Sequence, residues 1–294
     1  MKLKNELILT DLDFHFLKTL WKWKLLTTKA IHSTCYRSLS LSYIYQRLLR
    51  FEKIKLIESI SSWDQKVVVW QLADKGFQII LNELGQLYEN GFKSENKEHD
   101  FWVTAIHLGD WLTGIPENCD LFTEQELRRC SLTSYKSWVP QSKIHRPDGW
   151  WHTHTDKSND LNLISLEVEL SKKSPVAYND VGSFYSKEIS VYQVIWFVKS
   201  HADANYIQRH IIRGCLHQGE NHSFVLLDHF IQHQWQSKIF LGKNINSTLA
   251  SQLNTTSIQG ADQGNALELL DVRKKPIISI QQPKLQNTDL RLRR

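Results

Sequence analysis

Several motifs that carry known chemistries are missing from this sequence of 294 residues. It has no glycine-rich phosphate loop, no Gly-x-Ser-x-Gly elbow and no long internal repeat. These absences argue against nucleotide hydrolases, dinucleotide enzymes and serine esterases. Cysteine is scarce, and the four residues Cys35, Cys119, Cys130 and Cys215 form no Cys-x-x-Cys pair. Their spacing indicates neither a zinc knuckle nor a dense disulfide framework, so we expect a reducing compartment.

Long apolar runs are also absent. No stretch reaches the roughly 18 apolar residues that a membrane-spanning helix needs. The N-terminal segment MKLKNELIL contains an apolar run that is too short for a signal peptide. These features predict a cytoplasmic protein without a membrane partner.

The composition is that of a folded and mildly basic protein. Hydrophobic residues make up 41% of the chain and charged residues 23%, which is typical of a globular protein rather than a disordered one. The formal net charge is +5 and the isoelectric point is near 8.9. This charge permits a polyanionic partner without requiring one. The length allows at least one good core and favours two domains.

The N-terminal part has the pattern of a winged helix-turn-helix. Helical spacing of apolar residues predicts three helices, the third beginning near Ser38 or Ser40. Two strands follow, at residues 55–60 and 67–72, with a polar turn between them and a closing helix from Asp74 onward. Three helices, a two-stranded wing and a further helix make up a winged helix.

The third predicted helix would be the element that reads DNA. Its outer face carries hydroxyl, amide and guanidinium groups, which can bind base edges or phosphates in a groove. The candidate DNA-binding residues on this helix and on the wing are Ser42, Tyr45, Gln46, Arg47, Arg50 and Lys66. Two alternatives remain open: a winged helix that binds protein, and a solvated face. Tyr45 can equally be a core or dimer contact.

The chain divides into four parts. Residues 1–84 would form the winged helix, and residues 85–98 lose apolar periodicity and gain charge, which is typical of a linker. Residues 99–240 follow the order helix, strand, helix, two strands, helix, strand, helix, strand, which predicts an α/β domain. Residues 241–294 are rich in Asn, Gln, Ser and Thr and predict a polar, flexible tail.

Three carboxylates lie on the two central strands of the predicted α/β domain. Over residues 163–173, apolar residues alternate with Glu167 and Glu169, so the two acids share one face of a strand. Asp148 lies nineteen residues before Glu167, between a proline and a glycine that favour an extended approach and a sharp exit. If the two segments pair as neighbouring strands, the three acids converge near the Lys172–Lys173 pair.

This pattern predicts a metal-dependent phosphodiester site. Hard oxygen ligands suit Mg²⁺ or Mn²⁺, and such a metal can orient water and stabilise charge on phosphate. Asp148 and Glu167 are the candidate metal ligands, and Lys172 or Glu169 would position the attacking water. Three clustered acids without a cation would also repel one another. The arrangement resembles the core of the PD-(D/E)xK nuclease superfamily, with Glu169 where that motif has lysine.

A more specific resemblance rests on the predicted N-terminal winged helix together with three short segments downstream of it. They are FTEQELRR at residues 122–129, HRPDG at residues 145–149 and LEVELSK at residues 166–172. Together they resemble the replication-relaxation family of plasmid and integrative-element proteins, some of which are MobC-type mobilisation proteins. The resemblance covers residues 10 to about 230. It implies a restriction-endonuclease-like fold and a role in plasmid replication or conjugative mobilisation beside a relaxase, without establishing DNA cleavage.

These observations lead to three functional hypotheses. The first is a DNA-binding accessory protein of a mobile genetic element, in which the nuclease-like domain grips phosphate or is structural. The second is an active metal-dependent endonuclease, or nickase, that the winged helix delivers to double-stranded DNA. The third is a transcriptional repressor that uses the same winged helix.

Overall fold

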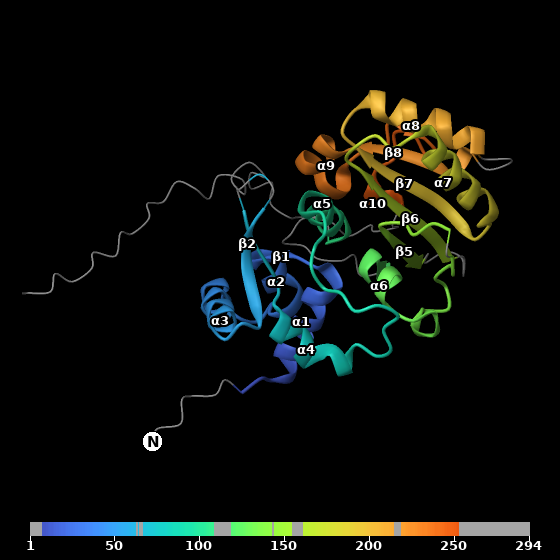
Figure 1. Cartoon of the computed structure of the whole chain (residues 1–294). Helices are drawn as coiled ribbons and strands as arrows, with labels where there is room; N and C mark the ends of the chain where they lie inside the picture. Colours follow the sequence, from blue (N-terminus) through green and yellow to red (C-terminus); the bar gives the residue numbers. More distant parts are fainter. Residues whose placement is uncertain are drawn as a thin grey trace, which may run out of the picture. The chain divides into compact units, whose positions relative to one another are not determined.

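A computed structural model describes residues 8–62, 64, 67–108, 119–142, 144–154, 161–214 and 219–252. The described residues all belong to one compact unit. They form a mixed α/β protein with a three-stranded sheet near the N-terminus and a six-stranded sheet after it (Figure 1). Among the described helices, none has the length and apolar character needed to cross a membrane.

The N-terminal part contains three helices before its sheet: α1 (Asp11–Trp23), α2 (Thr28–Cys35) and α3 (Leu41–Lys53). Each helix starts after a Thr or Ser that caps it, as Thr27 does for α2 and Ser40 for α3. Their apolar faces pack together around Phe16, Ile44 and Leu48, which are completely buried. The amphipathic spacing in the sequence thus produces a closed core at this end of the chain.

The small sheet has the order β1-β3-β2 and is antiparallel. Its strands are β1 (Leu26–Thr27), β2 (Ile57–Ser61) and β3 (Val68–Leu72). The helix α4 (Asp74–Ile80) follows β3 and packs Phe77 and Ile80 into the same core. The two strands predicted in this region are therefore present, and their connection contains Lys66, which lies outside the described residues.

The predicted linker, residues 85–98, is in contact with the folded parts on both sides of it. Trp21 Nε1 donates to the Gly91 carbonyl at 3.0 Å, and Gln125 Nε2 donates to the same carbonyl at 2.9 Å. Phe92 stacks on Phe77 with ring centroids 4.7 Å apart. The end of the segment is already helical, because α5 begins at Lys97. These contacts attach α1 to the second part of the chain.

The larger sheet has the order β4-β5-β6-β7-β8-β9. Its strands are β4 (Cys119–Thr123), β5 (Gly149–His154), β6 (Leu161–Glu169), β7 (Val191–Val198), β8 (His222–Leu226) and β9 (Leu241–Gly242). The first three strands are antiparallel neighbours, β7 and β8 run parallel to β6, and β9 is antiparallel to β8. The predicted pairing of the two acid-bearing segments is confirmed, since Gly149 lies opposite Leu166.

Helices cover both faces of this sheet. Figure 1 shows α7 (Pro175–Lys187) and α8 (His201–Gly214) side by side on one face, while α5 (Lys97–Leu108) and α9 (Leu227–His233) lie on the other. The short helix α6 (Glu124–Arg129) directly follows β4. Strand β6 follows the predicted alternation: Ile164, Leu166 and Val168 join the core on the α5 and α9 side. The nearly unbroken apolar run of β7 is explained by burial on both faces.

Two C-terminal segments differ from the sequence-based expectation. The order predicted for residues 99–240 ends in a strand, but β8 ends at Leu226 and helix α9 follows it from Leu227. Residues 241–252, which the sequence assigns to a tail, are folded into β9 and α10 (Leu249–Gln252). Gly242 has φ +91°, and a Cβ there would lie 1.9 Å from the His222 carbonyl oxygen. Only glycine therefore fits at this position, where β9 pairs with β8. Residues 253–294 lie outside the described residues.

Candidate functional site

Asp148 lies immediately before β5 and caps the neighbouring strand β6. Its backbone N–H donates to the Leu166 carbonyl at 3.0 Å, and its Oδ2 accepts a 2.6 Å hydrogen bond from the Val168 N–H. Val168 N–H would otherwise be an unpaired donor, because β5 pairs with β6 only as far as Leu166. The position of Asp148 next to the paired residue Gly149 places it across from Glu167.

Glycine is required beside Asp148 for a steric reason. A Cβ on Gly149 would lie 2.2 Å from His107 Nε2. His107 is fully buried, accepts from Trp151 Nε1 at 2.7 Å and donates to the Asp148 carbonyl at 3.2 Å. Burial lowers the pKa of His107 to about 4, so the ring is neutral near pH 7. These contacts give His107 a structural role.

Glu167 points to the face of the sheet covered by α7 and α8 and has two partners there. His145 Nε2 lies 2.6 Å from Glu167 Oε1, and the Tyr185 hydroxyl donates to the same oxygen. Burial disfavours the charged form of His145, but the neighbouring carboxylate outweighs this effect and raises its pKa. Glu167 is thus a buried carboxylate held by an imidazole and a phenol.

Glu169 is two residues further along the same face and is paired with a lysine. Lys173 Nζ lies 3.0 Å from Glu169 Oε2. Burial raises the pKa of Glu169, and Lys173 opposes this shift. The pKa of Lys173 is itself raised, because the charges of Glu169, Glu167 and Asp148 together outweigh its burial. One ammonium group therefore lies within the electrostatic field of all three predicted acids.

Lys172 has a different environment from Lys173. Its Nζ lies 3.2 Å from Asp203 Oδ1 and 5.6 Å from the centre of the Tyr206 ring, both on α8. The structure consequently brings Lys173, and not the predicted Lys172, to the acid pair on β6. Strand β6 ends at Glu169, so the alternation that positions the two glutamates no longer governs the residues after it.

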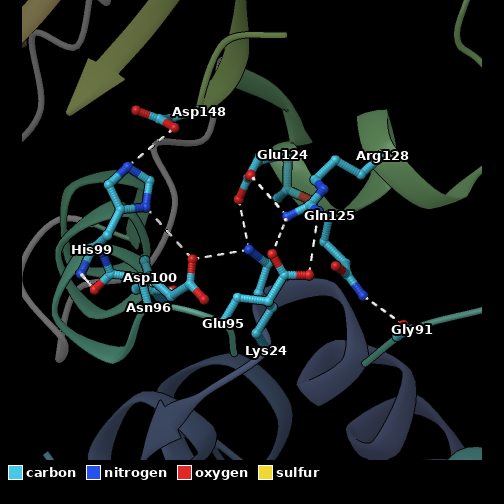
Figure 2. A network of polar contacts seen from close by, with 12 residues as sticks. Lys24, Gly91, Glu95, Asn96, His99, Asp100, Glu124, Gln125, Arg128 and Asp148 are labelled. Carbon is cyan, nitrogen blue, oxygen red and sulfur yellow. Dashed lines mark hydrogen bonds and ion pairs between the residues drawn. The ribbon is translucent and has the colours of Figure 1, made fainter. Parts of the chain in front are cut away.

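A buried polar network continues from Asp148 toward the N-terminal helices (Figure 2). His99 Nε2 lies 3.2 Å from Asp148 Oδ1, and His99 Nδ1 lies 3.6 Å from Asp100 Oδ1. Lys24 Nζ contacts Asp100 Oδ1 at 2.9 Å and Glu124 Oε2 at 2.6 Å. Lys24 is the C-cap residue of α1, so the network joins α1 to α5 and α6.

The charges in this network are stabilised by one another. Burial opposes the charge on His99, yet Asp148 and Asp100 outweigh it and raise the pKa of His99 to about 11. Burial likewise opposes the charge on Asp100, but His99 and Lys24 lower its pKa to about 2. His99, Asp148 and Lys24 are consequently all charged near pH 7.

One group within this network has the donor set of a metal site. Among the described residues, His99, Glu124 and Asp148 each offer one ligand atom, and these atoms lie within 4.8 Å of one another. His99 and Glu124 were not among the sequence-predicted site residues. The only sequence signals were a histidine and an acid in the first turns of two predicted helices, and these signals are common in helices without a site.

The predicted DNA-binding residues on α3 separate into two groups. Ser42, Tyr45, Gln46 and Arg50 are exposed. Arg47 instead turns inward: its Nε donates to Asp13 Oδ1 at 2.7 Å, and a second guanidinium nitrogen pairs with Oδ2. Asp13 is completely buried, so Arg47 compensates a charge inside the core and is not available for DNA.

Comparisons of the chain with protein-family models, curated proteins and solved structures found no match. The chemistry of the site therefore has to be inferred from its own residues. These residues provide a carboxylate-rich, partly buried cluster on one sheet and an exposed polar helix face near the N-terminus.

Proposed function

We propose that this chain is a DNA-binding protein of a mobile genetic element, acting in replication or mobilisation. The observation that carries the proposal is the exposed face of α3. Ser42, Gln46 and Arg50 follow one another at four-residue spacing, which places a hydroxyl, an amide and a guanidinium on one stripe, with Tyr45 beside it. These are the groups that bind phosphates and base edges in duplex DNA.

The surroundings of α3 support the same proposal. Helices α1 and α2 precede α3, and the β2–β3 pair follows it, which is the order of elements in a winged helix. Arg47 drops out of the proposed contact set because Asp13 holds it. The resemblance of the downstream segments to the replication-relaxation family provides the biological setting, with a relaxase as a candidate partner.

A DNA-binding measurement tests this proposal. Fluorescence anisotropy with a labelled duplex would compare wild type with Arg50→Ala and with Gln46→Ala over a range of salt concentrations. If Arg50 contacts a phosphate, its loss should weaken binding and reduce the magnitude of the salt slope by about one. Arg209→Ala is the matched control, since Arg209 is an exposed arginine on α8. Equal binding by all four proteins would contradict the proposal.

The second candidate function is a metal-dependent endonuclease. It is favoured by one observation: Asp148, immediately before β5, lies across from Glu167 on the neighbouring strand β6, and Lys173 is in the field of Asp148, Glu167 and Glu169. The donor set fits a hard divalent cation, because carboxylate oxygens are the ligands that Mg²⁺ and Mn²⁺ take. Asp148 and Glu167 would hold it, and the metal would activate water and stabilise charge on phosphate. Lys173 then takes the place of the lysine that Glu169 displaces.

The partners of Glu167 favour DNA binding over cleavage. His145 and Tyr185 already occupy one oxygen of its carboxylate. A metal at Glu167 would have to share or displace these partners. The protein can therefore keep Glu167 as a structural acid, with the nuclease-like part serving DNA binding only.

Supercoiled plasmid incubated with Mg²⁺ or Mn²⁺ distinguishes the two candidates. An endonuclease would nick the plasmid, and both Asp148→Ala and Glu167→Ala would lose the nicking. Intact DNA together with retained binding would reject the endonuclease and keep the accessory role. Preferential binding to the promoter of its own gene would instead identify a repressor.

A further inference from the structure

The side chains of His99, Glu124 and Asp148 come from three separate parts of the chain and meet at one point. His99 comes from the first turn of α5, Glu124 opens α6, and Asp148 precedes β5. One ligand atom from each lies within 4.8 Å of the other two. Figure 2 shows His99 and Asp148 at one end of the polar network, joined to Glu124 through Asp100 and Lys24. Two carboxylates and an imidazole at this separation can share one cation.

His99 is supported in the way that metal-binding histidines are supported. Its Nδ1 faces the Asp100 carboxylate at 3.6 Å, so that Nε2 is the nitrogen directed at Asp148, 3.2 Å away. A carboxylate behind the imidazole fixes the ring orientation and increases the basicity of the ligating nitrogen. Asp100 is in turn held by Lys24, which makes this second carboxylate part of a fixed arrangement.

We propose that His99, Glu124 and Asp148 form a site for a divalent transition metal such as Mn²⁺ or Zn²⁺. The imidazole decides the class of metal, because nitrogen ligands suit these ions better than Mg²⁺ or Ca²⁺. The inference rests on the second candidate function for the use of the metal, and it names the metal class and an alternative ligand set in which His99 and Glu124 take the place of Glu167 beside Asp148.

Lys24 explains how the acids stay together when no metal is bound. Its ammonium contacts Glu124 at 2.6 Å and Asp100 at 2.9 Å, which balances two of the carboxylates in the network. A cation at the three-residue site would share Glu124 with Lys24. It would also replace the proton on His99 Nε2, which would pass to solvent when the metal binds.

The proposed site differs from the Asp148–Glu167 site that the sequence predicts. Both use Asp148, but Glu167 faces α7 and is held by His145 and Tyr185, whereas His99 and Glu124 come from α5 and α6. Each location has its own histidine, His99 or His145. A measurement that identifies the ligating nitrogen can therefore distinguish the two sites.

Metal binding by the full chain, without DNA, provides the test. Metal-free protein would be titrated calorimetrically with manganese chloride and with magnesium chloride. Wild type should bind Mn²⁺ more tightly than Mg²⁺. His99→Gln should weaken Mn²⁺ binding by about tenfold or more and remove the preference over Mg²⁺. His15→Gln is the matched control, because His15 is an exposed histidine on α1 outside the three-residue group, and it should leave the affinity for Mn²⁺ unchanged.

Pulsed electron paramagnetic resonance of bound Mn²⁺ gives a second readout, which identifies the ligating atom instead of the affinity. Wild type should show hyperfine coupling to an imidazole nitrogen. The coupling should disappear in His99→Gln and persist in His145→Gln.

Two results would overturn the inference: no nitrogen coupling in wild type, or coupling that is lost in His145→Gln. Plasmid nicking is scored separately. Nicking with no nitrogen coupling would reject this metal site and keep the endonuclease. Coupling from His99 without any nicking would keep the metal site and reject the endonuclease.

Discussion

The two candidate functional regions differ in how their polar groups are compensated. On α3, the side chains proposed to bind DNA are exposed, and Tyr45 retains 46% of its accessible surface. Around Asp148, the side chains are largely buried, and most are paired with an opposite charge. Burying a charge is costly unless it is paired, whereas an exposed charge is solvated by water. We therefore expect substitutions on α3 to affect binding alone, and substitutions around Asp148 to affect stability as well.

The largest loss of stability should come from Lys24→Met. This change leaves Asp100, which is buried, and Glu124, which is 18% exposed, without their ammonium partner. Breaking a buried ion pair costs about 3–5 kcal/mol. Urea denaturation would measure the free energy of unfolding. Lys18→Met is the control, because the Lys18–Glu83 pair is 39% and 43% exposed and should contribute less than about 1 kcal/mol. Equal losses in both variants would remove the contrast between the two regions.

A change of pH should weaken the network around His99 and Asp100 without a mutation. The pKa of His99 is raised from 6.5 to about 11 in the folded protein. The contribution of His99 to the free energy of unfolding is thus complete below pH 6.5 and is lost as the pH rises toward 11. Asp100 has a lowered pKa of about 2, so its contribution is present above its ordinary value of 3.8 and is lost below it. Thermal unfolding between pH 5 and 9 should show falling stability above pH 6.5, and His99→Gln should flatten that fall.

A smaller effect is expected from Tyr185→Phe on the other side of Asp148. The substitution removes the phenol that donates to Glu167 and leaves His145 as the remaining partner. A hydrogen bond to a charged group contributes about 1.5–3 kcal/mol, so the free energy of unfolding should fall by this amount. Tyr192→Phe, at a tyrosine that is 38% exposed, is the comparison. No difference between the two variants would mean that Glu167 does not depend on Tyr185.

The smallest effect on stability should come from Arg50→Ala. Arg50 is exposed near the end of α3, and surface substitutions usually change stability by less than about 0.5 kcal/mol. The same variant should bind DNA more weakly, so loss of binding at unchanged melting temperature is the expected combination. A clear drop in the melting temperature of Arg50→Ala would instead mean that Arg50 stabilises the fold, as the buried and paired residues do.

Local rules were sufficient to predict α3 and the central strand β6, although not every element of the fold. The period of two in residues 163–170 assigns Glu167 and Glu169 to one face, and the structure has the apolar residues between them on the other. Capping residues such as Ser40 mark the start of α3 correctly. Both signals depend on residues that are close in sequence, so they can be recognised without a structure.

The pairing of charges could not be predicted, because the partners are far apart in sequence. Arg47 meets Asp13 across 34 residues, and Lys24 meets Glu124 across 100 residues. Asp13 lies in the first turn of α1, where an acid is expected for capping alone. Its pairing with Arg47 therefore has no signal in the sequence. The exchange of Lys172 for Lys173 has a related cause, since the chain leaves the strand before it reaches either lysine.

The position of Lys24 also has an evolutionary consequence. It ends α1 with φ 61° and carries its charge across to acids that belong to α5 and α6. If recombination joined this N-terminal part to an unrelated C-terminal part, Lys24 would lose its two acidic partners. Asp100 and Glu124, joined to an unrelated N-terminal part, would lose their cation. The two parts should therefore be inherited together, and a homologue that loses the lysine should have lost the acids as well.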